Sequence, residues 1–167
     1  MRSARRVFLS HTSEFAAHPK SKSYVDAAKD ACNSNECLVE DMSGWSAADF
    51  RPAEVCRRRV RGCDVYVGII GFSYGSPVLD EPDHSYTELE FEEARSRGLH
   101  VLVFLLADEG DMPLGLGRGN PKHADRQEAF RQRLRNEHLT IREFHNPDEL
   151  HNLIGQSLRE LSDSGLS

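Results

Sequence analysis

The sequence is poor in cysteine and in long apolar runs, and it lacks an excess of positive charge. Its four cysteines, Cys32, Cys37, Cys56 and Cys63, form no Cys-x-x-Cys pair and have no histidine at zinc-finger spacing. This pattern argues against a structural zinc site. In an intracellular chain we expect four reduced and partly buried thiols instead.

The longest apolar run, residues 101–107, is far shorter than the roughly 20 residues that a membrane-spanning helix needs. The basic start, residues 1–6, is followed by too few apolar residues for a signal peptide. With 21 Lys and Arg against 27 Asp and Glu, the net charge is −6, which gives no general electrostatic basis for binding nucleic acid or anionic membranes. We therefore expect a cytoplasmic protein that binds neither nucleic acid nor membrane.

The length of 167 residues, with 38% hydrophobic and 29% charged residues, is that of one ordinary globular domain. We place the domain at residues 1–161. The polar, glycine-containing residues 162–167 are typical of a linker.

Three short runs are apolar throughout, at residues 7–9, 65–70 and 101–106. Continuous apolarity predicts parallel strands that are buried on both faces of a sheet. Weaker strand signals lie at 37–42 and 140–144, so successive strands are roughly 30 to 40 residues apart, which is the length of a βαβ unit. The sequence therefore predicts an α/β doubly wound, five-stranded parallel sheet with helices on both faces.

Helix signals separate these strands. Pro52 and Gly62 bracket one helix, and Ser85-Tyr86-Thr87-Glu88 is a capping box that opens another, with Gly98 as its stop. Further helices are predicted at 24–32, 122–137 and 147–161. Residues 107–121, rich in glycine and proline, are interpreted as a plain surface loop, because their glycine spacing does not fit a dinucleotide fingerprint.

A ligand of such a sheet binds outside the carboxyl ends of the strands. The segments that follow the first three strands combine hydroxyls, glycines and aromatic rings, which suit a nucleotide. The same residue types also favour turns. The predicted binding residues are Ser10, His11, Thr12, Trp45, Gly71, Phe72, Tyr74, Ser76 and Tyr86.

The helix that begins after Ser85 carries a carboxylate in an unusual place. At about 100° per residue, Tyr86, Glu90 and Ala94 share one face, which is the least polar stripe of this helix. A carboxylate there is costly unless it is paired or faces a polar cavity. Glu90 is therefore a candidate functional residue, and the alternative is a structural glutamate near the helix start that the helix dipole and surface arginines stabilise. The other glutamates of the helix are interpreted as surface groups that interact with the helix dipole and with arginines.

Charged residues also cluster in two segments. Residues 57–61 contain four arginines, whereas residues 80–93 contain seven acidic residues and neither lysine nor arginine. These segments are either solvated faces or complementary surfaces for head-to-tail self-association. His11 beside Ser10 does not indicate a serine hydrolase, because no Gly-x-Ser-x-Gly elbow is present.

Five segments together resemble TIR-like domains, most closely the bacterial subgroup found at the N-terminus of NTPase and repeat-containing signalling proteins. The segments are RVFLSHTSE (6–14), RPAEVC (51–56), DVYVGIIG (64–71), YGS (74–76) and SYTELEFEEA (85–94). The resemblance implies a flavodoxin-like sheet of strand order 2-1-3-4-5 and, in enzymatic members, cleavage of the nicotinamide–ribose bond of NAD. Tyr86-x-x-x-Glu90 matches the family's aromatic residue and catalytic glutamate, with tyrosine in place of the more frequent tryptophan.

We therefore expect a TIR-like NAD nucleosidase, a hydrolase of signalling or bacterial immunity, with Glu90 as the catalytic carboxylate. NAD is the substrate, and neither a cofactor nor a metal is expected. Self-association, or association with other TIR-like domains, is the expected protein interaction. The alternatives are a non-enzymatic homotypic assembly module, a nucleotide-binding sensor, or a nucleoside transferase of similar fold.

Overall fold

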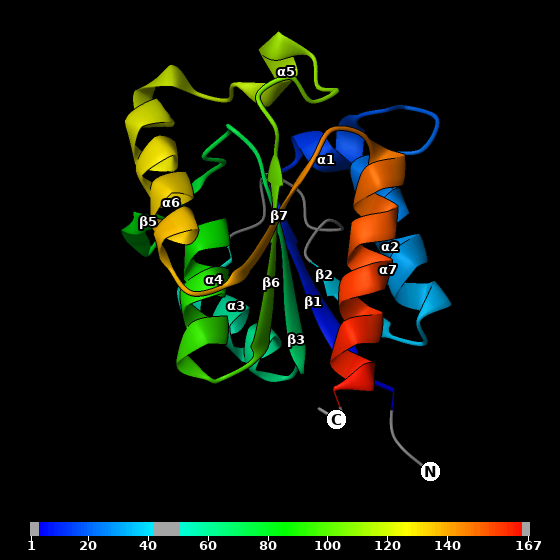
Figure 1. Cartoon of the computed structure of the whole chain (residues 1–167). Helices are drawn as coiled ribbons and strands as arrows, with labels where there is room; N and C mark the ends of the chain where they lie inside the picture. Colours follow the sequence, from blue (N-terminus) through cyan, green and yellow to red (C-terminus); the bar gives the residue numbers. More distant parts are fainter. Residues whose placement is uncertain (1–3, 42–50, 165–167) are drawn as a thin grey trace.

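The computed structural model describes residues 4–41 and 51–164. A five-stranded sheet of order β2-β1-β3-β6-β7 forms its centre, and all four pairings are parallel (Figure 1). Numbered along the chain, these five strands have the order 2-1-3-4-5, which confirms the predicted α/β flavodoxin-like class. The strands are β1 (Arg6–His11), β2 (Leu38–Asp41), β3 (Val65–Ile70), β6 (His100–Leu106) and β7 (Thr140–Phe144).

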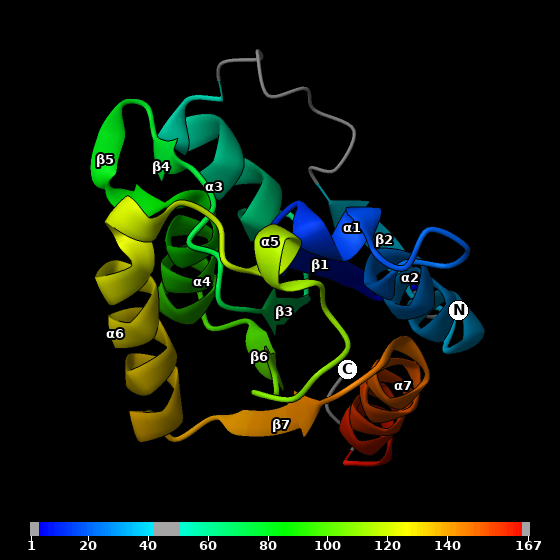
Figure 2. The same ribbon diagram turned by 90° about the horizontal axis from the view of Figure 1, so that it is seen from above.

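Helices cover both faces of the sheet (Figures 1 and 2). On one face lie α1 (Glu14–Ala17), α2 (Tyr24–Ser34) and α7 (Pro147–Asp163). On the other lie α3 (Ala53–Arg61), α4 (Tyr86–Ser96) and α6 (Ala124–Asn136). Each face has its own apolar core, and side chains alternate between the two cores along each inner strand. The continuous apolar runs of the sequence thus correspond to strands that are buried on both faces, as predicted.

The predicted boundaries of α4 agree with the structure. The Ser85 hydroxyl accepts a hydrogen bond from Glu88 N–H at 3.1 Å, and the Glu88 carboxylate accepts one from Ser85 N–H at 3.2 Å. Gly98 ends the segment with φ of +74°, a conformation that glycine adopts at little cost. The capping box therefore fixes where α4 begins, and with it which side chains face the sheet.

Three features depart from the sequence prediction. The segment 107–121 is not a plain loop, because it contains α5 (Leu114–Gly117) and part of a 3₁₀ turn, η1 (Pro121–His123). A four-residue helix is too short to show apolar periodicity. The hairpin of β4 (Pro77–Val78) and β5 (Glu81–Ser85) was not predicted, because the acidic and proline-containing strand β5 lacks β-favouring residues. Helix α7 also includes the first two residues of the predicted linker.

In the described part of the chain, no helix has the length and apolarity to cross a membrane. All four cysteines are buried and free. Burial raises the pKa of Cys32 to about 12 and that of Cys63 to about 11, so these thiols are poor nucleophiles at neutral pH.

Gly68, in the middle of β3, makes room for a tyrosine. A Cβ atom on Gly68 would lie 2.8 Å from Cε1 and 3.0 Å from the hydroxyl oxygen of Tyr66. The Tyr66 ring therefore extends along β3 over Gly68, toward the carboxyl end of the strand. Gly68 is also the register partner of Ser10 on β1.

We expect Gly68→Ala to lower the free energy of unfolding by about 1–3 kcal/mol, because the fully buried Tyr66 ring cannot move away freely. Urea denaturation measures the effect. Gly115→Ala is the matched control, since a Cβ atom there meets nothing within 4 Å. Equal stability of the two variants would contradict the packing described for Tyr66.

Candidate active site

The side chain of Glu90, a residue of α4, extends toward the carboxyl end of β1. Its side chain points from the sheet-facing side of α4 and the residue is 4% exposed. The Ser10 hydroxyl, on the penultimate residue of β1, donates a hydrogen bond to Glu90 Oε1 at 2.7 Å. The strand and the helix, which are 80 residues apart in the sequence, thus meet at one buried carboxylate.

The surroundings of Glu90 stabilise its negative charge only partly, so its pKa stays above the ordinary value. Burial raises its pKa to about 7, while the Ser10 hydrogen bond and the positive charge of Arg51 oppose this shift. Tyr86 positions Arg51, because its ring lies 4.3 Å from the guanidinium carbon and its hydroxyl donates to the Arg51 carbonyl at 3.1 Å. In the motif Tyr86-x-x-x-Glu90, the aromatic residue therefore affects Glu90 indirectly: it positions Arg51, whose positive charge favours the ionised carboxylate.

Two weak acids lie near Glu90. Burial raises the pKa values of the Tyr66 hydroxyl and the Cys56 thiol, and the Glu90 charge adds to both shifts. Both groups therefore stay protonated at neutral pH. The Tyr66 hydroxyl has no hydrogen-bond partner among the described residues, which leaves a buried donor beside the carboxylate.

Ser10→Ala removes the hydrogen bond that the Ser10 hydroxyl donates to the Glu90 carboxylate. We expect the pKa of Glu90 to rise further above its ordinary value, and the protein to lose about 1–3 kcal/mol of stability when Glu90 is ionised. Carbon-detected NMR titration of the glutamate carboxyls measures the pKa. Ser13→Ala is the control, because Ser13 is exposed and its side chain caps no helix. A Glu90 pKa that is unchanged in Ser10→Ala would contradict the role given to this hydrogen bond.

A second buried carboxylate, Glu14, lies where β1 ends and α1 begins. Glu14 is 2% exposed, and burial raises its pKa to about 7. The Thr12 hydroxyl is near enough to oppose part of this shift, but it is not in hydrogen-bonding geometry with Glu14. The carboxyl end of β1 is thus flanked by two carboxyl groups, each with a strongly raised pKa.

A family model for a domain of unknown function, DUF4062, matches residues 6–159 of this sequence. The chain belongs to the DUF4062 family. The matched region begins at the first residue of β1 and ends within α7, so it includes all five sheet strands, Glu14 and Glu90.

Other comparisons add little to the description of this DUF4062 domain. No protein with curated function matches the sequence. Among solved structures, a mutant of the esterase AlinE4 aligns with 99% of this chain and 96% of its own, at 13% identity and a TM-score of 0.42. At this identity and TM-score, the similarity says nothing about the activity of this chain.

The DUF4062 domain brings some of the predicted binding residues together. Ser10 contacts Glu90, Tyr86 holds Arg51, and Thr12 and Gly71 lie beside Glu14. Trp45 lies outside the described residues. These positions follow from β1 and β3 being neighbours in the sheet, which places the segments after them at one edge.

The remaining predicted residues make other contacts. The Tyr74 ring packs against His123 and Arg126 of the η1 and α6 region, with centroid distances of 5.2 and 4.7 Å. His11 Nδ1 lies 3.0 Å from the Thr12 carbonyl oxygen, and burial lowers the pKa of His11. Ser76 is exposed.

Two side chains of α6 that the sequence reasoning did not select contact residues 70–72, which follow or end β3. Arg131 lies 4.3 Å from the Phe72 ring centre and donates to the Ile70 and Leu106 carbonyls at 3.1 and 3.0 Å. Gln127 donates to the Gly71 carbonyl at 2.7 Å. These two side chains bind the carboxyl ends of β3 and β6, so they stabilise the edge where the candidate site lies.

Sequence reasoning also did not select Glu14, Arg51 or Tyr66. Glu14 follows a buried strand directly, which is a usable signal. Arg51 precedes Pro52 at the start of α3, and only its contact with Tyr86 reveals its place. Tyr66 was assigned to a strand core, and nothing in the sequence shows that its hydroxyl extends over Gly68.

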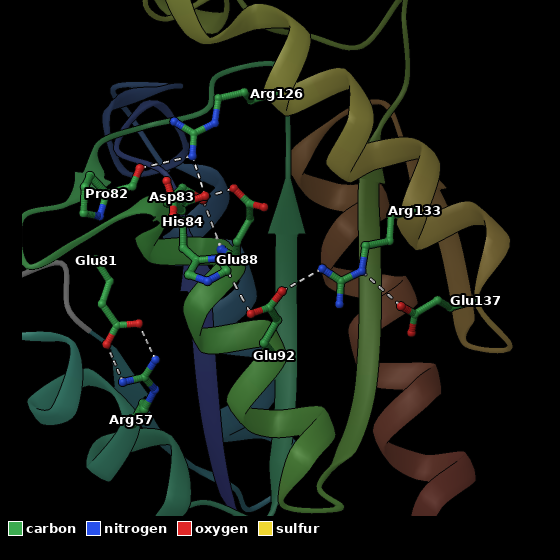
Figure 3. Close-up of polar contacts among 11 residues, drawn as sticks. Arg57, Glu81, Pro82, Asp83, His84, Glu88, Glu92, Arg126, Arg133 and Glu137 are labelled. Atoms are coloured by element: carbon green, nitrogen blue, oxygen red, sulfur yellow. Dashed lines mark hydrogen bonds and ion pairs between the residues drawn. The ribbon is translucent and has the colours of Figure 1, made fainter.

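The charged segments of the DUF4062 domain pair with each other inside one chain. Arg57 forms two hydrogen bonds with Glu81 at 2.6 and 2.7 Å (Figure 3). Arg61 donates to Glu93 at 2.9 Å, and Glu93 is buried and not the surface group that was predicted, because α3 packs over it. The same figure shows Glu92 bound to Arg133 of α6 at 2.7 Å. Such pairing within one molecule weakens the argument that these segments are complementary surfaces for self-association.

Arg126 reaches the same hairpin from α6. It donates to the Pro82 carbonyl at 3.1 Å and also to the Asp83 carbonyl (Figure 3). Helix α6 therefore contacts β5 through the two backbone carbonyls that Arg126 binds. It contacts α4 separately, through the ion pair between Arg133 and Glu92.

A depression of about 340 Å³ lies beside the edge strand β2. Its charged groups already have partners, since Lys29 is 3.0 Å from Asp41 and Glu40 accepts from Arg59 at 2.6 Å. It offers no buried carboxylate comparable with Glu90. We therefore assign the candidate active site to Glu90 and not to this depression.

Proposed function

We propose that this DUF4062 domain is a TIR-like NAD nucleosidase in which Glu90 is the catalytic carboxylate. The observation that carries the proposal is the buried carboxylate at the carboxyl end of β1, held by Ser10 at 2.7 Å. Its position in the motif Tyr86-x-x-x-Glu90, which resembles that of TIR-like enzymes, supports the same assignment.

The chemistry needs little beyond one placed carboxylate. The bond between the ribose C1′ and the pyridinium nitrogen breaks, and its electron pair goes to that nitrogen, which releases neutral nicotinamide. Positive charge develops on the ribose in an oxocarbenium-like transition state. An ionised carboxylate in a water-poor site stabilises this charge more strongly than it would in bulk water. Water then bonds to C1′ and loses a proton to solvent, giving ADP-ribose.

The pKa of Glu90 sets the expected pH dependence. Because the ionised form stabilises the transition state and its pKa is about 7, the rate increases with pH through this value and levels off above it. Arg51 and Ser10 favour the ionised form, so they support activity without contacting the reacting bond.

Nicotinamide release tests the proposal. We would incubate NAD with wild type, Glu90→Gln and Glu92→Gln at several protein concentrations. Glu92 is a matched control, because it lies on α4 two residues away and binds Arg133 at the surface. Release by wild type and Glu92→Gln but not by Glu90→Gln is the expected result. Equal release by all three would overturn the assignment of Glu90.

The alternative of a non-enzymatic assembly module is less favoured, because Arg57 and Arg61 pair with acids of their own chain. A nucleotide sensor or a nucleoside transferase would share the buried carboxylate. The same incubation separates them, since a sensor binds NAD without releasing nicotinamide, and a transferase releases it only with an acceptor base.

A further inference from the structure

The surroundings of Glu14 contain polar atoms that the fold leaves without partners. Both carboxylate oxygens of Glu14 and the Thr12 hydroxyl are buried and make no hydrogen bond among the described residues. Native proteins rarely bury such groups unsatisfied, because each costs about 1–3 kcal/mol. Three such atoms on neighbouring residues indicate that something else binds there.

The position of Glu14 in the sheet is one where ligands bind. In the order β2-β1-β3-β6-β7, β2 lies on one side of β1 whereas β3, β6 and β7 lie on the other, so the strand order reverses between β1 and β3. Helices α1 and α2 cover one face of the sheet and α4 covers the other. The crevice at the carboxyl ends of two such strands is the usual ligand site of a flavodoxin-like sheet. Glu14 follows β1, and a Cβ atom at Gly71, directly after β3, would lie 3.5 Å from Glu14 Oε2.

Two loops cover this place. A Cβ atom at Gly75, where φ is +75°, would lie 2.9 Å from Thr12 Cγ2, so the loop after β3 rests on Thr12. A Cβ atom at Gly119, where φ is +65°, would clash with the Ser73 hydroxyl oxygen, so the segment that contains Gly119 packs closely on the loop after β3. Seen along the strands from their carboxyl ends, the segment with α5 lies across β1 and β3 (Figure 2). A ligand therefore reaches Glu14 only when the loop after β3 moves outward.

The chemistry of the three atoms favours a pair of hydroxyls as the ligand. The described residues hold no cluster of three or more His, Cys, Asp or Glu side chains suited to a metal ion, and a hard cation needs six or more oxygens. The two oxygens of one carboxylate accept hydrogen bonds from the two hydroxyls of a sugar diol, as an acidic residue does for ribose in dinucleotide-binding folds. The Thr12 hydroxyl can donate to, or accept from, a third sugar oxygen.

We propose that Glu14 and Thr12 form a subsite for the vicinal diol of the adenosine ribose of a nucleotide ligand. This inference rests on the proposed function, because Glu90 would then act on the other ribose of NAD. Glu14 is a binding residue in this arrangement and does not contact the bond that breaks.

Adenosine diphosphate and its 2′,3′-dideoxy analogue test the subsite, because each has a single sugar and neither has the ribose that Glu90 would act on. Calorimetry at pH 6.5 with wild type, Glu14→Gln, Thr12→Val, Glu90→Gln and Glu92→Gln measures both affinities. We expect wild type and Glu92→Gln to bind the diol form about tenfold or more tighter than the dideoxy form. Glu14→Gln should lose this preference, and Thr12→Val should lose part of it.

Proton release gives a second readout that a purely structural role would not change. Two hydroxyl donors favour the ionised carboxylate, so binding of the diol form at pH 6.5 should release protons from wild type and fewer from Glu14→Gln. Repeating the calorimetry in buffers of different ionisation enthalpy measures this difference.

Three results would overturn the subsite: no binding of either nucleotide, equal binding of both by wild type, or full preference retained in Glu14→Gln. A preference that is lost in Glu90→Gln but kept in Glu14→Gln would move the diol to Glu90. Failure of the proposed function has a different signature, since wild type would then prefer the diol form and still release no nicotinamide from NAD.

Discussion

Glu14→Gln and Glu90→Gln are each expected to be more stable than wild type at pH 8, by up to about 3 kcal/mol. Each carboxyl has a folded pKa of about 7 and an ordinary value of 4.5. Between these values the folded protein holds more protons than the unfolded chain. The free energy of unfolding therefore decreases as pH rises from about 4.5 to 7, and it does not recover above 7.

Urea denaturation at pH 5, 6, 7 and 8 measures this slope. Each glutamine variant should lose the share of the slope that its own carboxyl supplies, because glutamine does not titrate. The control Glu92→Gln should keep the wild-type slope, since Glu92 lies on the same helix but is not buried against the sheet. Wild-type stability that rises from pH 5 to pH 8 would contradict the burial described for both groups.

The second large effect concerns turnover. Glu90→Gln is expected to lower kcat for nicotinamide release by about 100-fold or more, because the neutral amide cannot stabilise the developing positive charge. KM should change little, since glutamine retains the shape of the side chain and an acceptor for Ser10. Steady-state kinetics from pH 6 to pH 8 measures both constants.

The wild-type rate should also rise through a pKa near 7 in the same experiment. Ser10→Ala should shift this profile to higher pH, because it removes the hydrogen bond that favours the ionised form. A wild-type rate that is constant over this range would show that Glu90 titration does not control the chemistry.

Much of the fold could be predicted because it depends on local signals. Continuous apolar runs marked the strands buried on both faces, and the Ser85–Glu88 capping box fixed the start of α4. That start also determined the helix face, so the burial of Glu90 followed from the sequence. The strand order was an expectation from the family resemblance, and the structure confirms it.

The remaining features of the fold and the site depend on how helices and strands pack against one another. A single sequence does not show this packing. The sequence placed arginines on α3 and acids around α4, but only the packing of the two helices revealed that Arg61 binds Glu93. The Tyr66 hydroxyl near Glu90 depends on empty space above Gly68. The lack of partners around Glu14 is a property of the whole neighbourhood and not of any motif.

We propose that one buried carboxylate, Glu90, gives this DUF4062 domain NAD nucleosidase activity. The most direct test is nicotinamide formed from NAD over a wide range of protein concentrations, with wild type and Glu90→Gln measured side by side. Wild type is predicted to form nicotinamide and ADP-ribose in equal amounts, and Glu90→Gln to form about 100-fold less or none. No nicotinamide from wild type at any concentration, or equal amounts from both proteins, would contradict the claim.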